Sequence, residues 1–218
     1  MRFQGTTLYD TTLYYGHDPM CSWCWGFRPV WQQIQQALTG IVAIRYVLGG
    51  LAADSDRPMP TDMQASIRDT WRAIQKEIPG TVFNFDFWTK CQPRRSTYPA
   101  CRAIIAVRLL APQREADMLL AIQQAYYLQA KNPSDPDVLA EAATQLGLDR
   151  QDFIEMMHAE QCHRQLHEEI AFCRKINMNS FPGLVLKQGK SYTLLNIDYT
   201  NSNTVINQVV SACATRQG

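Results

Sequence analysis

The sequence predicts an α/β protein in which a strand–helix–strand start and a strand–strand–helix end are separated by a long helical segment. Three observations support this fold class. A β-rich run at residues 11–18 and a β-branched run at 41–48 flank an amphipathic helix. Nearly all of residues 60–178 has helical periodicity. β character then returns after residue 180.

The first fifty residues form the predicted β-α-β unit. "TTLYYGHD" (11–18) is rich in Thr, Leu and Tyr, which favour strands. In the following helix, Trp31, Ile34 and Leu38 are three and four residues apart, and Gly40 is a candidate C-cap. "IVAIRYVL" (41–48) is long enough for a buried strand and too short for a helix.

The helical segment begins at Thr61 and Gln64, which have the spacing of a capping box. That helix should end before Pro79, and "TVFNFDFW" (81–88) should be an aromatic connector or a short strand. Two further helices are expected on either side of Ala111-Pro112.

The second half of the helical segment has a helix with Asp135 as its cap, Pro136 at its first position and Gly147 at its end. One long helix is then expected from Asp149 toward Met178.

The C-terminal forty residues complete the predicted sheet unit. "FPGLVLKQGKSYTLLN" (181–196) contains two strand-like runs around a Gln-Gly turn, and a final helix should follow. We therefore predict a sheet unit formed by residues 1–58 and 179–218, and a helical insertion over residues 59–178.

Composition excludes some classes of function. With 21 basic and 20 acidic residues, the net charge of +1 does not indicate a nucleic-acid or membrane-surface partner. No apolar run approaches the roughly 18 residues of a membrane span. The start lacks the features of a secretory signal, so a cytoplasmic location is expected if Met1 is the true start. The odd number of cysteines, 7, also suits a reducing compartment.

Two of these cysteines, Cys21 and Cys24, are separated by two residues in "PMCSWCWGF" (19–27). They lie at the joint between the first strand and its helix. At a helix N-terminus, free backbone N–H groups and the helix dipole favour a negative charge. We therefore expect Cys21 to be an exposed nucleophile whose thiolate is stabilised. Cys24, one turn later, should face inward and resolve the mixed disulfide that Cys21 forms.

A zinc site is the alternative use of this pair. His17 has the spacing to join Cys21 and Cys24, but a structural site needs four ligands and the chain has no second C-x-x-C motif. Another group of metal-ligand residues comprises His158, Cys162, His163 and His167. His163 and His167 point away from the apolar stripe of their helix, so we interpret them as a solvent-exposed helix flank, and we predict no metal.

A proline at position 29 lies inside the predicted helix, where it costs about 3 kcal/mol and bends the axis. The C-x-x-C-x-x-x-x-P spacing resembles that of thioredoxin-like proteins. Over its whole length the chain is similar to the DsbA-like branch of the thioredoxin superfamily. "PMCSWCWGF" resembles the C-x-W-C-aromatic-G pattern of FrnE-like proteins, which are predicted cytoplasmic protein-disulfide isomerases.

This resemblance implies a thioredoxin-like fold with a helical insertion, and thiol–disulfide oxidoreductase or isomerase activity without a cofactor. In thioredoxin folds a cis-proline faces the C-x-x-C motif, which assigns that place to Pro182. The backbone of Phe181 would then pair with an extended substrate. The implied substrates are polypeptide thiols and disulfides or glutathione, and the family also allows a homodimer.

The chain departs from some members of the superfamily. Ser22-Trp23 replaces the Pro-His dipeptide of periplasmic DsbA, so strong oxidant behaviour is not implied. Kappa-class glutathione transferases and hydroxychromene-carboxylate isomerases have serine at the place of Cys21. Two alternatives stay open: a glutathione-dependent transferase or isomerase on the same scaffold, and a non-enzymatic zinc or redox-sensing adaptor.

Other residues near the motif receive simpler interpretations. Arg94 and Arg95 could meet a glutathione carboxylate, but we expect them in a solvated loop. Asp18 could modulate the thiolate. An apolar collar around the thiols is expected from Trp23, Trp25 and Phe27. The remaining cysteines should be small core residues; they are Cys91, Cys101, Cys162, Cys173 and Cys213.

Overall fold

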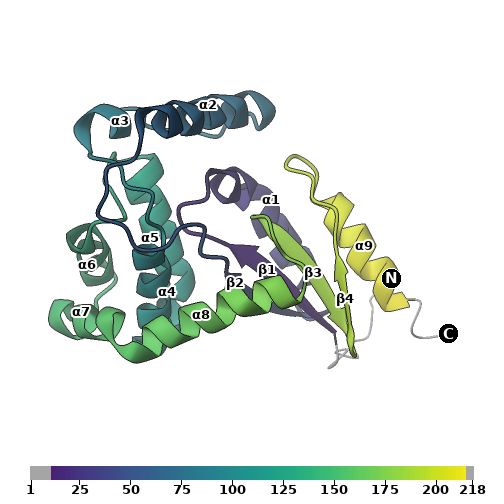
Figure 1. Ribbon diagram of the computed structural model, residues 1–218. Coiled ribbons are helices and arrows are strands. Elements are labelled where there is room, and N and C mark those ends of the chain that lie inside the picture. The colour runs from purple at the N-terminus through teal and green to yellow at the C-terminus, as the bar shows by residue number, and fades with distance from the viewer. Residues whose placement is uncertain (1–10, 215–218) are drawn as a thin grey trace.

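The computed structural model describes residues 11–214 and contains a mixed four-stranded sheet with the strand order β2-β1-β3-β4. The strands are β1 (Thr11–His17), β2 (Ala43–Leu48), β3 (Gly183–Gln188) and β4 (Ser191–Leu194). β1 is parallel to β2 and antiparallel to β3, and β3 and β4 form a hairpin (Figure 1). The predicted α/β fold class and strand positions are confirmed.

The register of the sheet brings three chain segments together at one end of its strands, which is called the sheet edge below. Gly16 pairs with Val47 of β2 on one side and with Gly183 of β3 on the other. The segments that leave β1 and β2 and the segment that enters β3 therefore meet there. This edge carries the C-x-x-C motif, the loop after residue 48 and the Phe181–Pro182 pair.

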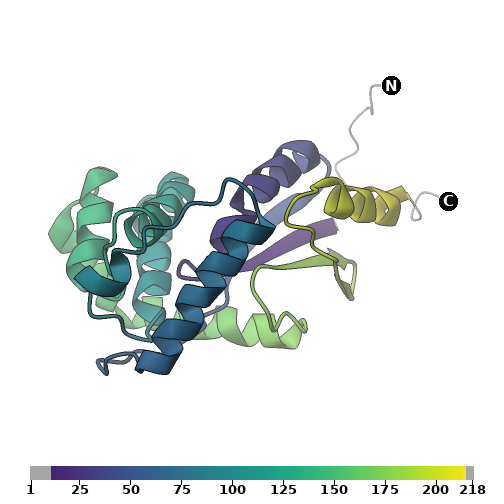
Figure 2. The same cartoon turned by 90° about the horizontal axis from the view of Figure 1, so that it is seen from above.

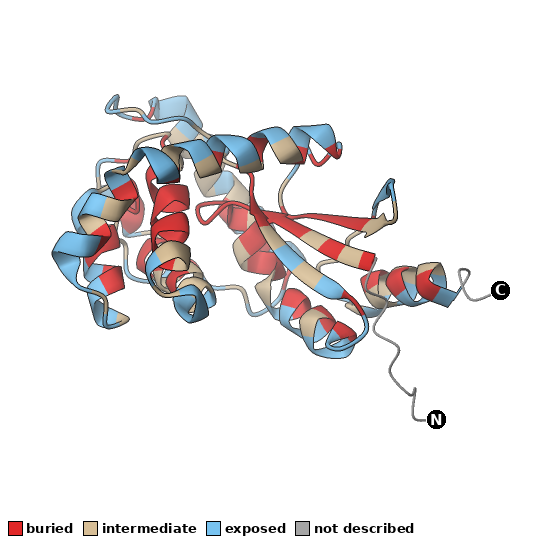
Figure 3. Cartoon of the chain, turned by 90° about the horizontal axis from the view of Figure 1, so that it is seen from below, coloured by how far each residue is buried: buried red, intermediate tan, exposed pale blue. Residues whose placement is uncertain are grey.

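Helices cover both faces of the sheet (Figures 1 and 2). α1 (Ser22–Leu38) and α9 (Asn203–Ala214) cover one face, where Trp31 and Ile34 pack with Leu13 and Val209. α8 (Glu160–Lys175) lies on the other face, where Cys173 packs with Val47 of β2 and Val185 of β3, the strands on either side of β1. Since each face is covered, the central strands are largely buried, as Figure 3 shows.

The other helices form a second group beside the sheet: α2 (Thr61–Glu77), α3 (Phe87–Lys90), α4 (Tyr98–Leu110), α5 (Glu115–Tyr127), α6 (Pro136–Gln145) and α7 (Arg150–His158), with a 3₁₀ turn at Pro112–Arg114. α4 is central, because residues 99–107 are all buried. A helix that is apolar on all sides needs such surroundings. None of the helices in residues 11–214 is long and apolar enough to cross a membrane.

The predicted division into a sheet unit (1–58 and 179–218) and an insertion (59–178) stays a prediction. Its ends, residues 1–10 and 215–218, lie outside the described part of the chain. α8 takes part in both cores: Leu166 packs among the insertion helices and Cys173 packs on the sheet.

The single long helix expected from Asp149 toward Met178 is wrong. The chain breaks at Ala159, which has extended backbone angles (φ −63°, ψ 143°) between α7 and α8. α7 packs on α4 and α6, whereas α8 crosses from α4 to β2, so the two helices need different directions. No glycine or proline marks the break, because tertiary packing sets it.

One smaller expectation also fails. The capping box at Thr61 does not form: Pro60 precedes the helix, and the Gln64 side chain donates from Nε2 to the Met59 carbonyl (2.8 Å) instead. Of the two alternatives given for residues 81–88, the structure has the connector: these residues form no strand, and a turn leads into the short helix α3.

A buried carboxylate joins the segments at the edge of the sheet. Asp18 directly follows β1 and is 0% exposed. Its Oδ1 accepts from the Met20 amide (2.8 Å), and its Oδ2 accepts from the Leu51 amide (2.8 Å) and the Thr97 hydroxyl (2.7 Å). Thr97 in turn accepts from the Ala52 amide (3.1 Å). The C-x-x-C loop, the loop after β2 and the start of α4 are thus held by one side chain.

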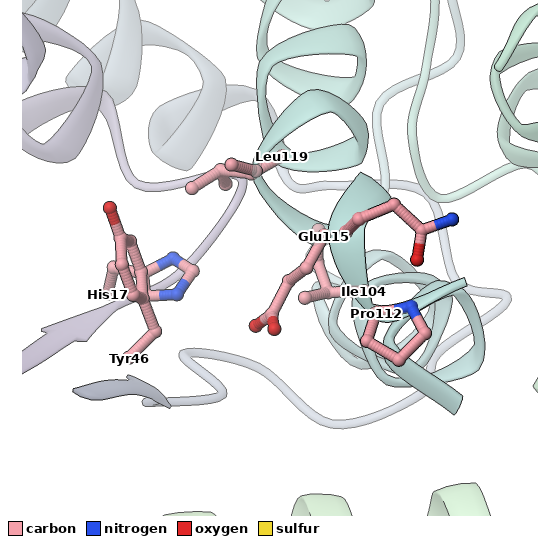
Figure 4. Close-up of a pocket in the computed structure, with 8 residues that line it drawn as sticks. His17, Tyr46, Ile104, Pro112, Glu115 and Leu119 are labelled. Carbon is pink, nitrogen blue, oxygen red and sulfur yellow. The ribbon is translucent and has the colours of Figure 1, made fainter. Parts of the chain in front are cut away.

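A second junction encloses a cavity of about 200 Å³ between the sheet and the insertion. Figure 4 shows the His17 ring and the Glu115 carboxylate facing each other across it. His17 is 1% exposed, and neither ring nitrogen has a hydrogen-bond partner among the described residues. Its ring stacks on Tyr15 (5.3 Å) and meets Tyr46 edge-on (5.5 Å).

Ionic contacts tie this second junction together. Arg108 on α4 pairs with Glu115 (2.8 Å) and with Glu169 of α8. Glu169 also accepts from the Leu48 amide at the end of β2 (2.6 Å). Burial and the charge of Arg108 lower the pKa of His17 to about 3. The imidazole is therefore neutral at physiological pH.

We expect Thr97→Val to destabilise the fold by about 2 kcal/mol, because it removes the hydroxyl that both donates to Asp18 and accepts from Ala52. Urea unfolding followed by circular dichroism measures this. Thr97→Ser keeps the hydroxyl and should lose about half as much or less. Equal losses in the two variants would show that the hydroxyl is unimportant.

The buried His17 should make the fold acid-sensitive. The folded-state pKa of about 3 lies below the ordinary value of 6.5, so the unfolded chain binds more protons between these values. The neutral imidazole's contribution is complete above pH 6.5 and is lost progressively as the pH falls toward 3. Between pH 8 and pH 4.5 the loss should be about 2–3 kcal/mol.

His17→Phe keeps a stacked ring but cannot titrate. Between pH 8 and pH 4.5, the unfolding free energy of this variant should therefore fall by about 2–3 kcal/mol less than that of the wild type. The exposed His158 provides the control, since His158→Gln should retain the wild-type pH dependence. Urea titrations at several pH values compare the three proteins. Parallel curves for wild type and His17→Phe would contradict the assignment to His17.

Candidate active site

The cysteine pair lies at the start of α1, where Cys21 is the N-cap and Ser22 the first helical residue. The Cys21 amide donates to the Asp18 carbonyl (3.0 Å), and the Cys21 carbonyl accepts from Trp25 (3.1 Å). No side chain caps this end of the helix. The N–H groups of the first turn of α1 therefore have no side-chain cap at the end of the helix where Cys21 lies.

Cys21 is not exposed, contrary to expectation. It is 6% exposed and opens into a cavity of about 240 Å³. Thr70 and Tyr126 from the insertion and Phe181 from the loop before β3 enclose this cavity. Sequence reasoning missed this burial, because the enclosing side chains come from segments distant in the chain.

The predicted partner segment lies directly against Cys21. The Cys21 thiol donates to the Phe181 carbonyl oxygen (3.2 Å), and the Phe181–Pro182 peptide bond is cis. The Phe181 ring fits over Gly49, where a Cβ atom would lie 2.1 Å from the ring. Glycine at position 49 is thus required for Phe181 to reach this place.

Cys24 is the more deeply buried of the pair, at 1% exposed. Burial raises the pKa of its thiol well above the ordinary value, and the hydrogen bond and charge of the neighbouring Cys21 sulfur raise it further. The charge of Asp18 acts in the same direction. Cys24 is therefore protonated at neutral pH, which gives the two thiols different chemistry.

The insertion also holds the residues between the cysteines. Trp71 of α2 is fully buried and donates its indole N–H to the Ser22 hydroxyl (2.9 Å). Sequence reasoning missed this contact, since nothing in the periodicity of α2 distinguishes Trp71 from a simple core residue. The C-x-x-C motif is thus fixed from the insertion as well as from the sheet.

The expected aromatic collar is only partly present. Trp23 lines the cavity beside Cys21 and contacts Tyr199 (4.9 Å). Trp25 instead faces the insertion, donates to the Val82 carbonyl (3.0 Å) and stacks on an insertion tyrosine. Phe27 is 0% exposed in the core of the sheet. Helical geometry separates these three side chains by about 100° per residue.

The two arginines are not in a solvated loop. Arg94 and Arg95 are half-buried and line the same cavity as Cys21. Arg94 pairs with Asp135 and donates to the Ser134 carbonyl (2.8 Å). Adjacent arginines gave no sequence signal for this placement, because their partners lie about forty residues away.

The described residues provide no set of ligands for the zinc alternative. Within residues 11–214, no group of three or more His, Cys, Asp or Glu side chains is placed to hold a metal ion. His17 faces the cavity of Figure 4. His158 of α7 and His167 of α8 are exposed. His163 of α8 is half-buried, and Cys162 of the same helix is buried.

The other thiols are mostly core residues, as expected. Cys101, Cys173 and Cys213 are buried. Cys91 is only half-buried and donates its thiol to the Ala130 carbonyl (3.0 Å).

Comparison with known proteins agrees with this geometry. The family model described as Thioredoxin matches residues 14–207. The structure of a proposed protein disulfide isomerase from Nitrosomonas europaea is 25% identical, with a TM-score of 0.81 over 96% of this chain and 100% of that chain. The cytosolic disulfide reductase DsbM from Pseudomonas aeruginosa is 21% identical, with a TM-score of 0.73 over 95% and 100%.

A second structure of DsbM contains glutathione (GSH) and is 23% identical, with a TM-score of 0.67 over 85% of this chain and 89% of that chain. Curated relatives include the ClpXP adapter protein SpxH of Halalkalibacterium halodurans. It is 23% identical over 77% of this chain, which spans only 56% of the length of that relative. The SpxH protein of Bacillus subtilis is 21% identical over 82% of this chain and 64% of its own length.

The family match spans most of the chain, and DsbA structures from several bacteria share the fold. This chain therefore belongs to the thioredoxin family and has the DsbA-like architecture, with its cysteine pair at the start of α1.

Proposed function

We propose that the protein is a thiol–disulfide oxidoreductase in which Cys21 attacks and Cys24 resolves. The observation that carries this proposal is the position of the Cys21 sulfur, at an uncapped helix N-terminus and 3.2 Å from the Phe181 carbonyl. A helix N-terminus favours the attacking thiolate. The buried, protonated Cys24 lies one helical turn away and is available for the second step.

In the first step, the Cys21 thiolate attacks one sulfur of a substrate disulfide. A bond forms between Cys21 and that sulfur while the substrate S–S bond breaks, and the other substrate half leaves as a thiolate that takes up a proton. The Phe181 carbonyl, released from the Cys21 thiol, accepts an N–H of the bound substrate chain. Pro182 holds this carbonyl at the entrance of β3.

In the second step, Cys24 loses its proton and attacks the Cys21 sulfur. The Cys21–Cys24 disulfide forms, and the second substrate half leaves as a thiol. Two electrons have then moved from the protein dithiol to the substrate. Two molecules of a small thiol return the protein to its dithiol form and leave as a disulfide, and net turnover requires that this thiol differ from the thiol released from the substrate.

We propose that the protein works in the reducing direction in the cytoplasm. The support is its similarity to DsbM, which is named a cytosolic disulfide reductase and whose structure has also been solved with GSH. Isomerisation of protein disulfides would use the same first step.

Adaptor function is the second candidate, favoured by the similarity to SpxH, which is named a ClpXP adapter protein. An adaptor would need no turnover at the cysteine pair. The glutathione-dependent transferase or isomerase alternative also stays open, and it predicts activity that survives the loss of Cys24.

We expect Cys24→Ser to trap a mixed disulfide between Cys21 and the substrate, and to lower multiple-turnover disulfide reduction by about 100-fold or more. Mass spectrometry of the intact protein identifies the adduct. Cys21→Ser should form no adduct, and Cys91→Ser serves as the control outside the site. Undiminished turnover in Cys24→Ser would favour the transferase alternative, and no turnover in the wild type would favour the adaptor.

A redox titration in glutathione buffers tests the direction. Alkylation and mass spectrometry should locate one reversible disulfide, between Cys21 and Cys24. A midpoint potential within or below the cytosolic range of roughly −220 to −320 mV supports a reductase. A midpoint near roughly −120 mV would instead identify an oxidant.

A further inference from the structure

The cavity beside Cys21 contains a cation that the fold leaves without an ionic partner. Arg95 is half-buried and lines this cavity together with Cys21 and Phe181. Its guanidinium has no ion pair or hydrogen bond with any residue in the described range 11–214. The nearby Asp18 attracts it, but the Asp18 oxygens are occupied by other donors.

The neighbouring Arg94 shows the contrast. The Arg94 guanidinium is neutralised by Asp135 and bound to the Ser134 carbonyl, so it is used for structure. Arg95 has no such role, although its backbone is well anchored. Next to it, the Ser96 carbonyl accepts from the Ser134 hydroxyl (2.7 Å).

Among the described residues, no acidic side chain lines this cavity, and its wall is largely apolar, with Leu51, Met59 and Ile67. A guanidinium in apolar surroundings attracts an anionic group strongly, because little water screens the pair. Its planar array of donors matches a carboxylate in particular. The cavity is therefore suited to a ligand that carries a carboxylate close to its sulfur.

The size of the cavity limits the ligand. About 240 Å³ beside a thiol that is 6% exposed accommodates a group of the size of an amino acid or dipeptide. Each half of oxidised glutathione is a tripeptide with two carboxylates and a net charge of −1, so part of one half would occupy the cavity while the rest lies outside it.

We propose that Arg95 is a substrate-binding residue that recognises a carboxylate of the incoming disulfide, and that small anionic disulfides of the glutathione type are the preferred substrates. This inference rests on the proposed function, because it assigns the substrate of the same Cys21 reaction. The reaction itself is unchanged: the substrate S–S bond breaks, and the protein dithiol supplies the electrons.

The test compares three disulfides of different charge: oxidised glutathione, neutral 2-hydroxyethyl disulfide and cationic cystamine. The reduced protein is mixed with each, and formation of the Cys21–Cys24 disulfide is followed by quenching and alkylation. We expect the ratio of the second-order rate constants for oxidised glutathione and 2-hydroxyethyl disulfide to fall by about tenfold in Arg95→Gln. The rate constant for the neutral disulfide should change by less than about twofold.

Matched variants separate charge from geometry. Arg95→Lys keeps the charge but loses the planar fork, so its ratio should be intermediate. Arg57→Gln removes an equal charge from an exposed position and should retain the wild-type ratio. Raising the salt concentration should reduce the preference in the wild type more than in Arg95→Gln.

The outcomes are distinguishable. If wild type reacts with all three disulfides and Arg95→Gln keeps the wild-type ratio, the assignment of Arg95 is wrong while the proposed function stands. If the wild type reacts with none of them, the proposed function fails as well. A preference for cystamine would overturn the inference directly, since it would indicate an anionic site.

Discussion

The site depends on a single buried carboxylate. Asp18 has no exposed surface, so each of its oxygens must find donors inside the protein. These donors are the amides of Met20 and Leu51 and the hydroxyl of Thr97, which belong to three different segments. Burial raises the pKa of Asp18 even though these hydrogen bonds lower it, so the carboxylate is held at a cost. Satisfying it brings the cysteine loop, the loop after β2 and the start of α4 to one point.

The active site is consequently shared between the sheet and the inserted helices. The sheet unit supplies Cys21 and the Phe181 carbonyl, to which the proposed reaction assigns the chemistry. The insertion supplies Trp71, which fixes Ser22, and the walls that enclose Cys21. A thiol reached through a small cavity selects its substrate by size and charge before any bond forms. A thiol on an open surface would accept any disulfide that collided with it.

Local signals in the sequence were sufficient for much of this fold. Periodicity and strand propensity predicted the strands, the helices and the place of the cysteine pair, because those features depend on near neighbours in the chain. The break at Ala159 was not predictable, since it arises from the different directions in which α7 and α8 pack. Likewise, nothing local separates Arg94, which has an acidic partner 41 residues away, from Arg95, which has none among the described residues. The burial of Cys21 was missed for the same non-local reason.

The sheet unit provides the cysteine pair, and other segments provide most of the cavity wall. This separation explains how one fold can occur in proteins with different names. The cysteine pair, the start of α1 and the Phe181 carbonyl depend on the sheet unit and its register. The cavity wall depends on helices and loops that the sheet does not specify, such as α2 and the segment that carries Arg95. A change in that wall alters which partner reaches Cys21 without disturbing the thiol chemistry. Proteins named as a disulfide reductase and as a ClpXP adapter both resemble this chain, which is the pattern expected when the wall and the thiols can vary separately.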